Sequence, residues 1–174
     1  MTESFLEELM FNEAGDEAVF AVTSPRDVRD AREALRAIGG SDIGELVLSE
    51  AVTNTLRNFG CVVLAHVDHD LQRTILEIIS EANERDVWRV RGRVSRAKAK
   101  KVHGSAMVPN PRRESGRGLG IIVSFSEQVN VGAYRNPQTG QAVSLRVRAI
   151  IPHEAAPVGP PGGEFGLATL DDVA

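Results

Sequence analysis

Two short segments constrain the fold and the chemistry of this chain more than any other part of the sequence. Residues 45–57 have the pattern of a helix and place Glu50 and Asn54 four positions apart, on one helix face. Residues 114–122 form a glycine-rich turn that leads into an apolar helix. A carboxylate and an amide on one face suit a magnesium ion and an activated hydroxyl, whereas a glycine turn at a helix start suits phosphate. Together the two segments predict a nucleotide site.

The glycine segment carries the stronger chemical signal. Gly116, Gly118 and Gly120 alternate where the helix begins, so the backbone can approach a phosphate closely. The helix N-terminus adds aligned N–H donors and the positive end of the helix dipole, and Arg117 adds a charge. A glycine triplet alone is also compatible with a flexible turn that binds nothing, just as a glutamate and an asparagine are common on helix surfaces.

The composition is typical of a soluble, globular, single-domain protein. The chain has 174 residues, of which 42% are hydrophobic and 25% are charged. The net charge of -4 argues against general nucleic-acid binding, and no stretch approaches the roughly 20 apolar residues of a membrane helix. The N-terminus is acidic where a secretory signal would be basic, and Cys61 is the only cysteine. We therefore expect a cytoplasmic protein with no internal disulfide, no membrane segment and no direct nucleic-acid contact.

The first third of the chain predicts an arm, a strand and two helices. Residues 1–16 show no strong period and predict a loose arm, and residues 17–23 predict a strand. Capping and terminating residues then mark the two helices, namely Ser24-Pro25, Gly39-Gly40, and Ser41 or Asp42.

The region from 61 to 96 is compatible with more than one secondary structure. Residues 61–67 are apolar and predict a strand. Residues 74–80 fit a second strand after a polar turn, but their apolar positions also fit one face of a helix, and the period alone does not decide. Residues 87–94 alternate, with Trp88 on the apolar side, and predict a half-exposed strand.

The last part of the domain predicts a loop, a helix and a hairpin. Residues 95–115 are basic and contain glycine and proline, which is typical of a long mobile loop and of lids. The helix after Gly116 is expected to run to about Glu127. Residues 129–149 alternate around an Asn-Pro-Gln-Thr-Gly turn and predict a hairpin with one buried face. Residues 152–174 are rich in proline and glycine and predict a disordered tail.

The charge is unevenly distributed along the chain. Eight of the 20 basic residues lie between residues 84 and 101, where only Glu84 and Asp86 oppose them. Such a block usually marks a solvated face, but it can also meet phosphates or an acidic partner. Its basic members are Arg85, Arg89, Arg91, Arg93, Arg96, Lys98, Lys100 and Lys101.

The two segments, in this order, resemble the motifs of a known family. Residues 49–54 (SEAVTN) resemble the N-box of the GHKL, or histidine-kinase-like, ATPases, and residues 114–120 (ESGRGLG) resemble their second glycine box. The helix after Ser24 and the final hairpin also fit the bacterial branch of anti-sigma factors that are serine kinases. The resemblance covers residues 17–151, which we take as one GHKL ATPase-like domain.

The resemblance implies a fold and a set of site residues. The fold would be an α+β two-layer sandwich of the Bergerat type, with helices on one face of a mixed, mostly antiparallel sheet. ATP would lie between the helices, under a basic lid region at residues 84–115. By matching position, Glu50 would be the catalytic base and Asn54 the magnesium ligand, and the nucleotide phosphates would be held by Gly116, Arg117, Gly118 and Gly120.

The resemblance also implies partners. Family members bind a sigma factor and hold it inactive, and many phosphorylate a serine on a small STAS-domain antagonist, which releases the sigma factor. For this chain the implied cofactors are ATP and Mg²⁺, and the implied partners are a sigma factor, a STAS-domain antagonist, or both. Family members are often dimers, so a homodimer is implied as well.

The chain departs from the family at the segment that would recognise adenine. The family carries an Asp-x-Gly-x-Gly box, whose Asp binds the adenine amino group. Counting from Asn54 places the box near residues 80–83, and counting back from Gly116 places it near residues 92–95, but neither segment has its glycines. Glu81 keeps a carboxylate there. Two functions therefore stay open, namely an ATP-binding anti-sigma factor with kinase activity, and a degenerate module that sequesters a partner with weak or no nucleotide binding.

Overall fold

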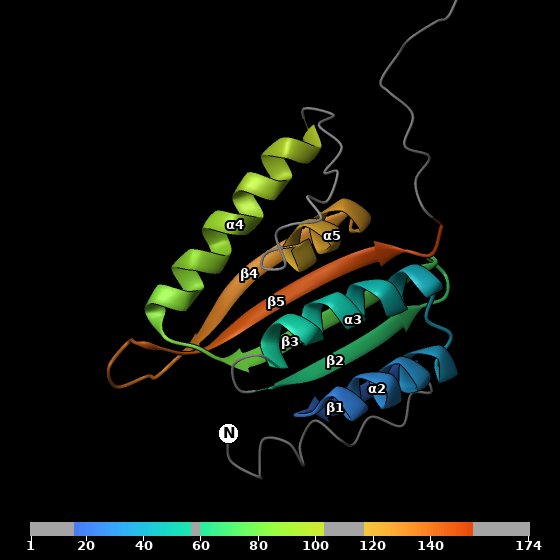
Figure 1. Cartoon of the computed structure of the whole chain (residues 1–174), viewed down its shortest axis with the longest axis horizontal. Coiled ribbons are helices and arrows are strands. Elements are labelled where there is room, and N and C mark those ends of the chain that lie inside the picture. Colours follow the sequence, from blue (N-terminus) through green and yellow to red (C-terminus); the bar gives the residue numbers. More distant parts are fainter. Residues whose placement is uncertain (1–15, 57–59, 103–116, 155–174) are drawn as a thin grey trace, which may run out of the picture.

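The computed structural model describes residues 16–56, 60–102 and 117–154. Within these ranges the chain forms four helices and five strands (Figure 1). The strands are β1 (Glu17–Val22), β2 (Cys61–Asp68), β3 (Arg73–Glu81), β4 (Gln128–Arg135) and β5 (Ala142–Pro152). The helices are α2 (Pro25–Ala37), α3 (Asp42–Leu56), α4 (Glu84–Val102) and α5 (Arg117–Phe125).

The five described strands form one sheet with the order β1-β2-β3-β5-β4, and the helices pack on one face of it (Figure 1). This arrangement confirms the predicted α+β class with two layers. The expectation of a mixed sheet is wrong, because every pair of neighbouring strands is antiparallel. The connections explain this. Short turns join β2 to β3 and β4 to β5, which makes each pair a hairpin.

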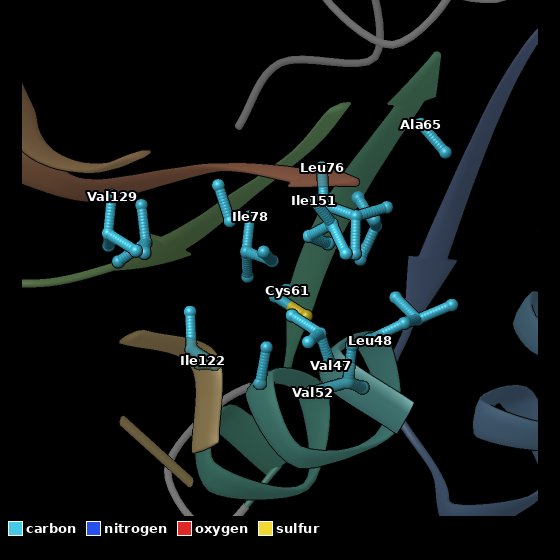
Figure 2. Close-up of a cluster of buried hydrophobic side chains, with 14 of the residues drawn as sticks. Val47, Leu48, Val52, Cys61, Ala65, Leu76, Ile78, Ile122, Val129 and Ile151 are labelled. Carbon is cyan, nitrogen blue, oxygen red and sulfur yellow. The ribbon is translucent and has the colours of Figure 1, made fainter. Parts of the chain in front are cut away.

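The hydrophobic core lies between the sheet and the helices. Side chains alternate between the two faces of the sheet, and in β2, β3 and β5 most residues that face the helices are buried. Figure 2 shows α3 and α5 directing apolar side chains toward those of the sheet. Leu48, Leu76 and Ile151 have 0% of their surface exposed there, and burial of each stabilises the fold by about 1.5–3 kcal/mol relative to an exposed position. Cys61 belongs to the same core, and its burial raises the pKa of the thiol.

The predicted ends of α2 and the start of α3 are confirmed. The Asp27 Oδ2 atom accepts a hydrogen bond from the Ser24 backbone N–H at 2.9 Å, which caps the first turn of α2. Gly39 follows the end of α2 with a φ of 87°, a conformation that favours glycine. Ser41 caps α3, because its Oγ accepts from the Gly44 N–H at 3.1 Å.

The structure decides between the alternatives for the middle of the chain. Residues 73–81 are a strand, so the strand alternative for 74–80 is correct. Residues 84–102 are one helix, so the predicted strand over 87–94 is wrong, and the predicted loop does not include residues 95–102. The rest of that predicted loop, residues 103–115, lies outside the described residues.

Burial against neighbouring elements explains why α4 is a helix. Val87, Val94 and Ala97 are 0%, 4% and 7% exposed, and their spacing of three to seven residues puts them on one helix face. That face packs on α5 and on the β4–β5 hairpin. Trp88, which the alternating pattern places on the apolar side, is 64% exposed instead. Asn83 caps the helix, since its Oδ1 accepts from the Asp86 N–H at 3.1 Å.

The predicted arm and tail fall almost wholly outside the described residues. Of the arm, only Asp16 is described, and the tail is described to Glu154, with β5 ending at Pro152. In the described ranges, no helix has both the length and the apolar character required to cross a membrane.

Candidate functional site

A cavity of about 280 Å³ lies where α3, α4 and α5 meet the sheet. Segments that are far apart in the sequence line it together. Its volume is close to the lower end of the roughly 300–1,000 Å³ that small-molecule sites occupy, which suits a nucleobase better than a complete nucleotide. The lining residues are Ala51, Thr55, Ile78, Ser80, Glu81, Ala82, Asp86, Arg89, Val90, Arg93, Leu119, Ile122, Leu145 and Val147.

The inner wall of the cavity is mostly apolar. Ile78 of β3 and Leu145 and Val147 of β5 contribute from the sheet, and Ile122 contributes from α5. None of the four is more than 8% exposed. They are buried because they occupy strand and helix positions that face the core. A wall of this kind suits the apolar face of an aromatic ring.

Ser80 places a hydroxyl on this apolar wall. It lies two residues after Ile78 on β3, so its side chain starts on the same face of the sheet, and it is 8% exposed. Among the residues of the described ranges, none forms a hydrogen bond with its side chain. Its oxygen keeps access to the cavity, where water or a ligand can form a hydrogen bond with it. Ser80 is therefore well placed to bind a polar edge of a ligand.

Two neighbours of Ser80 complete the polar part of the wall. Thr55 on α3 donates through Oγ1 to the Val52 carbonyl at 2.8 Å, which leaves its oxygen able to accept. Glu81 follows Ser80 on the strand, so its side chain starts on the opposite face of the sheet, and it is exposed at the cavity edge. The hydroxyl of Ser80, and not the carboxylate of Glu81, is thus the buried polar group of this segment.

Helix α4 supplies two arginines and one aspartate, Asp86, to the cavity. Arg89 and Arg93 are four residues apart, so they lie on one face of α4, and both line the cavity. Arg89 Nη1 lies 3.6 Å from Asp86 Oδ1. Arg93 forms no ion pair with any residue of the described ranges. Guanidinium groups bind phosphate and carboxylate oxygens through paired N–H donors, so this wall suits an anionic group.

Polar contacts hold α4 in place at both ends. The Glu84 carboxylate accepts two hydrogen bonds from the Arg135 guanidinium, at 2.7 and 2.9 Å, and this pairing lowers the pKa of Glu84. At the other end, Lys101 Nζ donates to the carbonyls of Val123 and Ser126 at 3.0 and 2.8 Å. Burial lowers the pKa of Lys101. These carbonyls belong to the end of α5, where a cation is favourable, so Lys101 fixes the distance between two walls of the cavity.

A buried carboxylate joins α2 to α3. Glu45 is 3% exposed and accepts hydrogen bonds from Arg36 at 2.7 and 2.8 Å and from Arg32 at 3.1 and 3.2 Å. Burial raises the pKa of Glu45, but the two guanidinium groups outweigh it and the pKa is lowered. The pair of arginines thus positions the helix that carries Glu50 and Asn54.

The structure brings the two sequence motifs together, because α3 and α5 pack against each other. Glu50 lies half-buried on α3 and does not line the cavity, although the next residue, Ala51, does. Asn54 lies on α3 as predicted, and its side chain is outside the described part of the structure. No group of three or more metal-ligating side chains occurs among the described residues, so a Mg²⁺ site through Asn54 stays a prediction.

The glycine motif occupies the start of α5. Arg117 is the first residue of the helix, and its side chain is not among the described ones. Gly118 and Gly120 lie within the first turn and are buried, while Leu119 lines the cavity. Gly116 lies outside the described residues. The helix N-terminus predicted by the glycines is therefore present, with two of the three glycines inside the helix.

Sequence reasoning missed four of the polar residues at the cavity as site residues. Thr55, Arg89 and Arg93 carried no motif of their own, and Ser80 lacks the carboxylate that the family pattern requires. Two signals pointed toward them. The segment near residues 80–83 was one of two candidates for the adenine box, and the basic block contains both arginines.

Comparison with known proteins identifies the fold and not the family. No family model matches the chain, and no curated protein matches it. Among solved structures, the chain is similar to one in the crystal structure of the SiaB–SiaC complex from Pseudomonas aeruginosa, with a TM-score of 0.62 and 16% sequence identity. The match covers 87% of this chain and 99% of that chain. The two chains therefore share a fold.

Proposed function

We propose that this chain is an ATP-binding regulatory domain of the GHKL type, which acts by holding a protein partner such as a sigma factor inactive. The observation that carries the nucleotide part is the cavity at the junction of α3, α4, α5 and the sheet. It combines an apolar wall for a ring, a buried hydroxyl for a polar ring edge, and two arginines for an anionic group. The helices that carry both family motifs form two of its walls.

The solved structure supports the partner-binding part. The similar chain belongs to a complex of two proteins, SiaB and SiaC. A shared fold does not determine a shared function, but it supports a role in which this chain also binds another protein. Under the proposal, that partner is a sigma factor or a STAS-domain antagonist.

Serine kinase activity is the second part of the proposal. Phosphoryl transfer depends mainly on positioning and on stabilisation of charge. Glu50 would orient the serine of a STAS-domain antagonist, Asn54 would hold Mg²⁺, and the phosphates would lie at the start of α5, near Gly118 and Gly120. Glu50→Ala is expected to keep nucleotide binding and to lose transfer of radiolabelled phosphate to the antagonist.

Two observations favour the second candidate, a module that sequesters a partner without using nucleotide. Within residues 80–83, one of the two candidate positions for the adenine box, the buried polar group is the Ser80 hydroxyl. In addition, Glu50 does not line the cavity. A hydroxyl donates and accepts, so it distinguishes adenine from other bases less than a carboxylate does.

Displacement of a fluorescent ATP analogue by unlabelled nucleotides separates the two candidates. Under the proposal, ATP, ADP and AMP displace the analogue with decreasing affinity, because each nucleotide in this order has fewer phosphate oxygens that can bind Arg89 and Arg93. Absence of saturable binding, with the protein folded by circular dichroism, would leave the sequestering module.

A further inference from the structure

The outer face of α4 combines an exposed aromatic side chain with a row of small residues. Trp88 is 64% exposed, and the Arg91 guanidinium lies over its ring at 5.9 Å from the ring centre. Gly92, Ser95 and Ala99 follow Trp88 at spacings of four, seven and eleven residues, which places all four on one side of the helix. This side points away from Val87, Val94 and Ala97, the buried residues of α4. We call it the outer face of α4, and it also includes Arg85 and Arg96.

The small residues leave room for a second helix. A Cβ added at Gly92 would meet only the Arg96 Nη1 atom within 4 Å, at 3.7 Å, so this part of the face is open. Ser95 and Ala99 are exposed. The distance between packed helices is set by the side chains at their contact, and small residues permit the closest approach. Trp88 at one end of the row would serve as a buried anchor, since tryptophan is prominent among the residues that dominate binding energy.

The charges on this face have one sign. Arg85 and Arg96 lie on one side of the small row, and Lys98 lies on the other, next to Arg91. None of Arg85, Arg96 or Lys98 forms an ion pair within the described ranges. The two acidic residues of α4 are used elsewhere, because Glu84 binds Arg135 and Asp86 lies at the cavity beside Arg89. The partner that complements this face therefore carries negative charge.

The position of α4 makes the face accessible. In Figure 1 the helix runs across the β4 edge of the molecule, and its far end projects beyond the sheet. Its inner side is covered by α5 and the hairpin. Tryptophan is enriched in the cores of protein–protein interfaces relative to the rest of the surface.

We propose that the outer face of α4 is the docking site for an acidic amphipathic helix of the partner protein. The apolar stripe of that helix would pack along Gly92, Ser95 and Ala99 and cover Trp88, and glutamates or aspartates on its flanks would meet Arg85, Arg96 and Lys98. The inference deepens the proposed function by naming the surface that binds the partner. It does not depend on nucleotide binding, because the cavity lies on another side of α4, lined by Arg89 and Arg93.

A designed peptide tests this site directly. The probe is a synthetic helix-forming peptide of five turns, with a leucine and alanine stripe flanked by glutamates. Trp88 is the only tryptophan of the chain, so its fluorescence reports contact at this face. The expected result is a blue shift of the emission that saturates with peptide concentration and weakens with salt. Two control peptides are the same helix with lysine in place of every glutamate, and a scrambled sequence that has no apolar stripe.

Protein variants identify the residues that bind. Arg85→Glu combined with Arg96→Glu is expected to weaken peptide binding by about tenfold or more, because two attractions become repulsions. Ser95→Gln should weaken it as well, by blocking the small row. The matched control is Arg26→Glu combined with Arg148→Glu, the same change of charge on α2 and β5. All five positions are exposed, so the variants are expected to fold.

The outcomes are distinct. Saturable binding of the glutamate peptide alone, lost in the α4 variants and kept in the control, supports the proposal. Equal binding of the lysine or scrambled peptide, an unchanged Trp88 emission, or equal affinities of the α4 and control variants would overturn it. Nucleotide displacement is measured on the same samples, so a failure of the docking site is separated from a failure of the nucleotide site.

Discussion

Ser80 of β3 and Arg93 of α4 line the same cavity. In the sequence, the segments that contain them are alternative positions for the box that would bind adenine. Counting along the chain places the missing adenine box either near residues 80–83 or near residues 92–95. The structure brings both segments to one site, with a hydroxyl from the first and a guanidinium from the second. A ligand bound between them would meet a neutral hydrogen-bonding group at one end and a positive charge at the other.

The Ser80 hydroxyl is expected to contribute to ligand binding and not to folding. Ser80→Ala should weaken ATP binding by about 2–12-fold, the equivalent of about 0.5–1.5 kcal/mol for one hydrogen bond. Its melting temperature without ligand should not fall, because the hydroxyl has no partner among the described residues. Displacement of a fluorescent nucleotide and thermal unfolding measure the two effects. Ser144→Ala, on the other face of the sheet, is the control, and equal affinities of the two variants would refute this role.

The two cavity arginines are expected to recognise the phosphates. Arg89→Ala and Arg93→Ala should each weaken binding of ATP by about 10–150-fold, since a hydrogen bond to a charged group contributes about 1.5–3 kcal/mol. Binding of adenosine should change little. Isothermal titration with both ligands makes the comparison, and Arg85→Ala, on the outer face of α4, is the matched control. A parallel loss of adenosine and ATP affinity would mean that the arginines do not bind phosphate.

Lys101 is expected to hold the cavity together from a distance. Lys101→Met keeps the aliphatic stem but removes the donors to the Val123 and Ser126 carbonyls, which should cost about 1–3 kcal/mol of stability. ATP affinity should fall as well, because α4 and α5 are both walls of the cavity. Urea unfolding measures the first effect. Lys100→Met, at an exposed neighbour without such contacts, should leave both quantities unchanged.

The buried Glu45 should make the stability depend on acid pH. Its pKa in the folded state lies below the ordinary value of 4.5, so the stabilisation is complete above that value and is lost as the pH falls through the folded pKa. Glu45→Gln should lower the unfolding free energy by about 1–3 kcal/mol at neutral pH and should flatten its decline toward pH ~3. Urea unfolding across this range gives the measurement. Glu33→Gln, whose carboxylate is exposed beside Arg29, is the control, and an equally steep decline in the Glu45 variant would contradict the assignment.

Local signals in the sequence predicted most of the fold. Ser24, Gly39 and Ser41 mark helix ends through short-range hydrogen bonds and a positive φ, so their roles could be inferred without the rest of the chain. The hairpin around residues 136–140 is marked by turn residues in the same way. Residues 87–94 were assigned wrongly because an alternation over eight residues also fits one helix face, and the burial of Val87 and Val94 against α5 depends on a contact that is distant in the sequence.

In the candidate site, too, the features that depend on local sequence were predicted and those that depend on distant contacts were not. The motif residues Glu50, Asn54 and Gly118 were correctly placed on two helices, because spacing and glycine content are local properties. The cavity depends on how α4 lies over the sheet, and the sequence contained no local signal for that. Ser80 could be recognised only after the strand register showed that it faces inward beside Leu145.

The central claim, that the cavity binds nucleotide, is tested most directly by the melting temperature of the full chain with and without Mg-ATP. A ligand that binds only the folded state, at a concentration of about 100 times its dissociation constant, stabilises the folded protein by about 2.7 kcal/mol. For a chain of this size, that raises the melting temperature by about 5–10 °C. The proposal predicts such a rise, reduced in a variant that combines Arg89→Ala with Arg93→Ala. An unchanged melting temperature at millimolar Mg-ATP would contradict it.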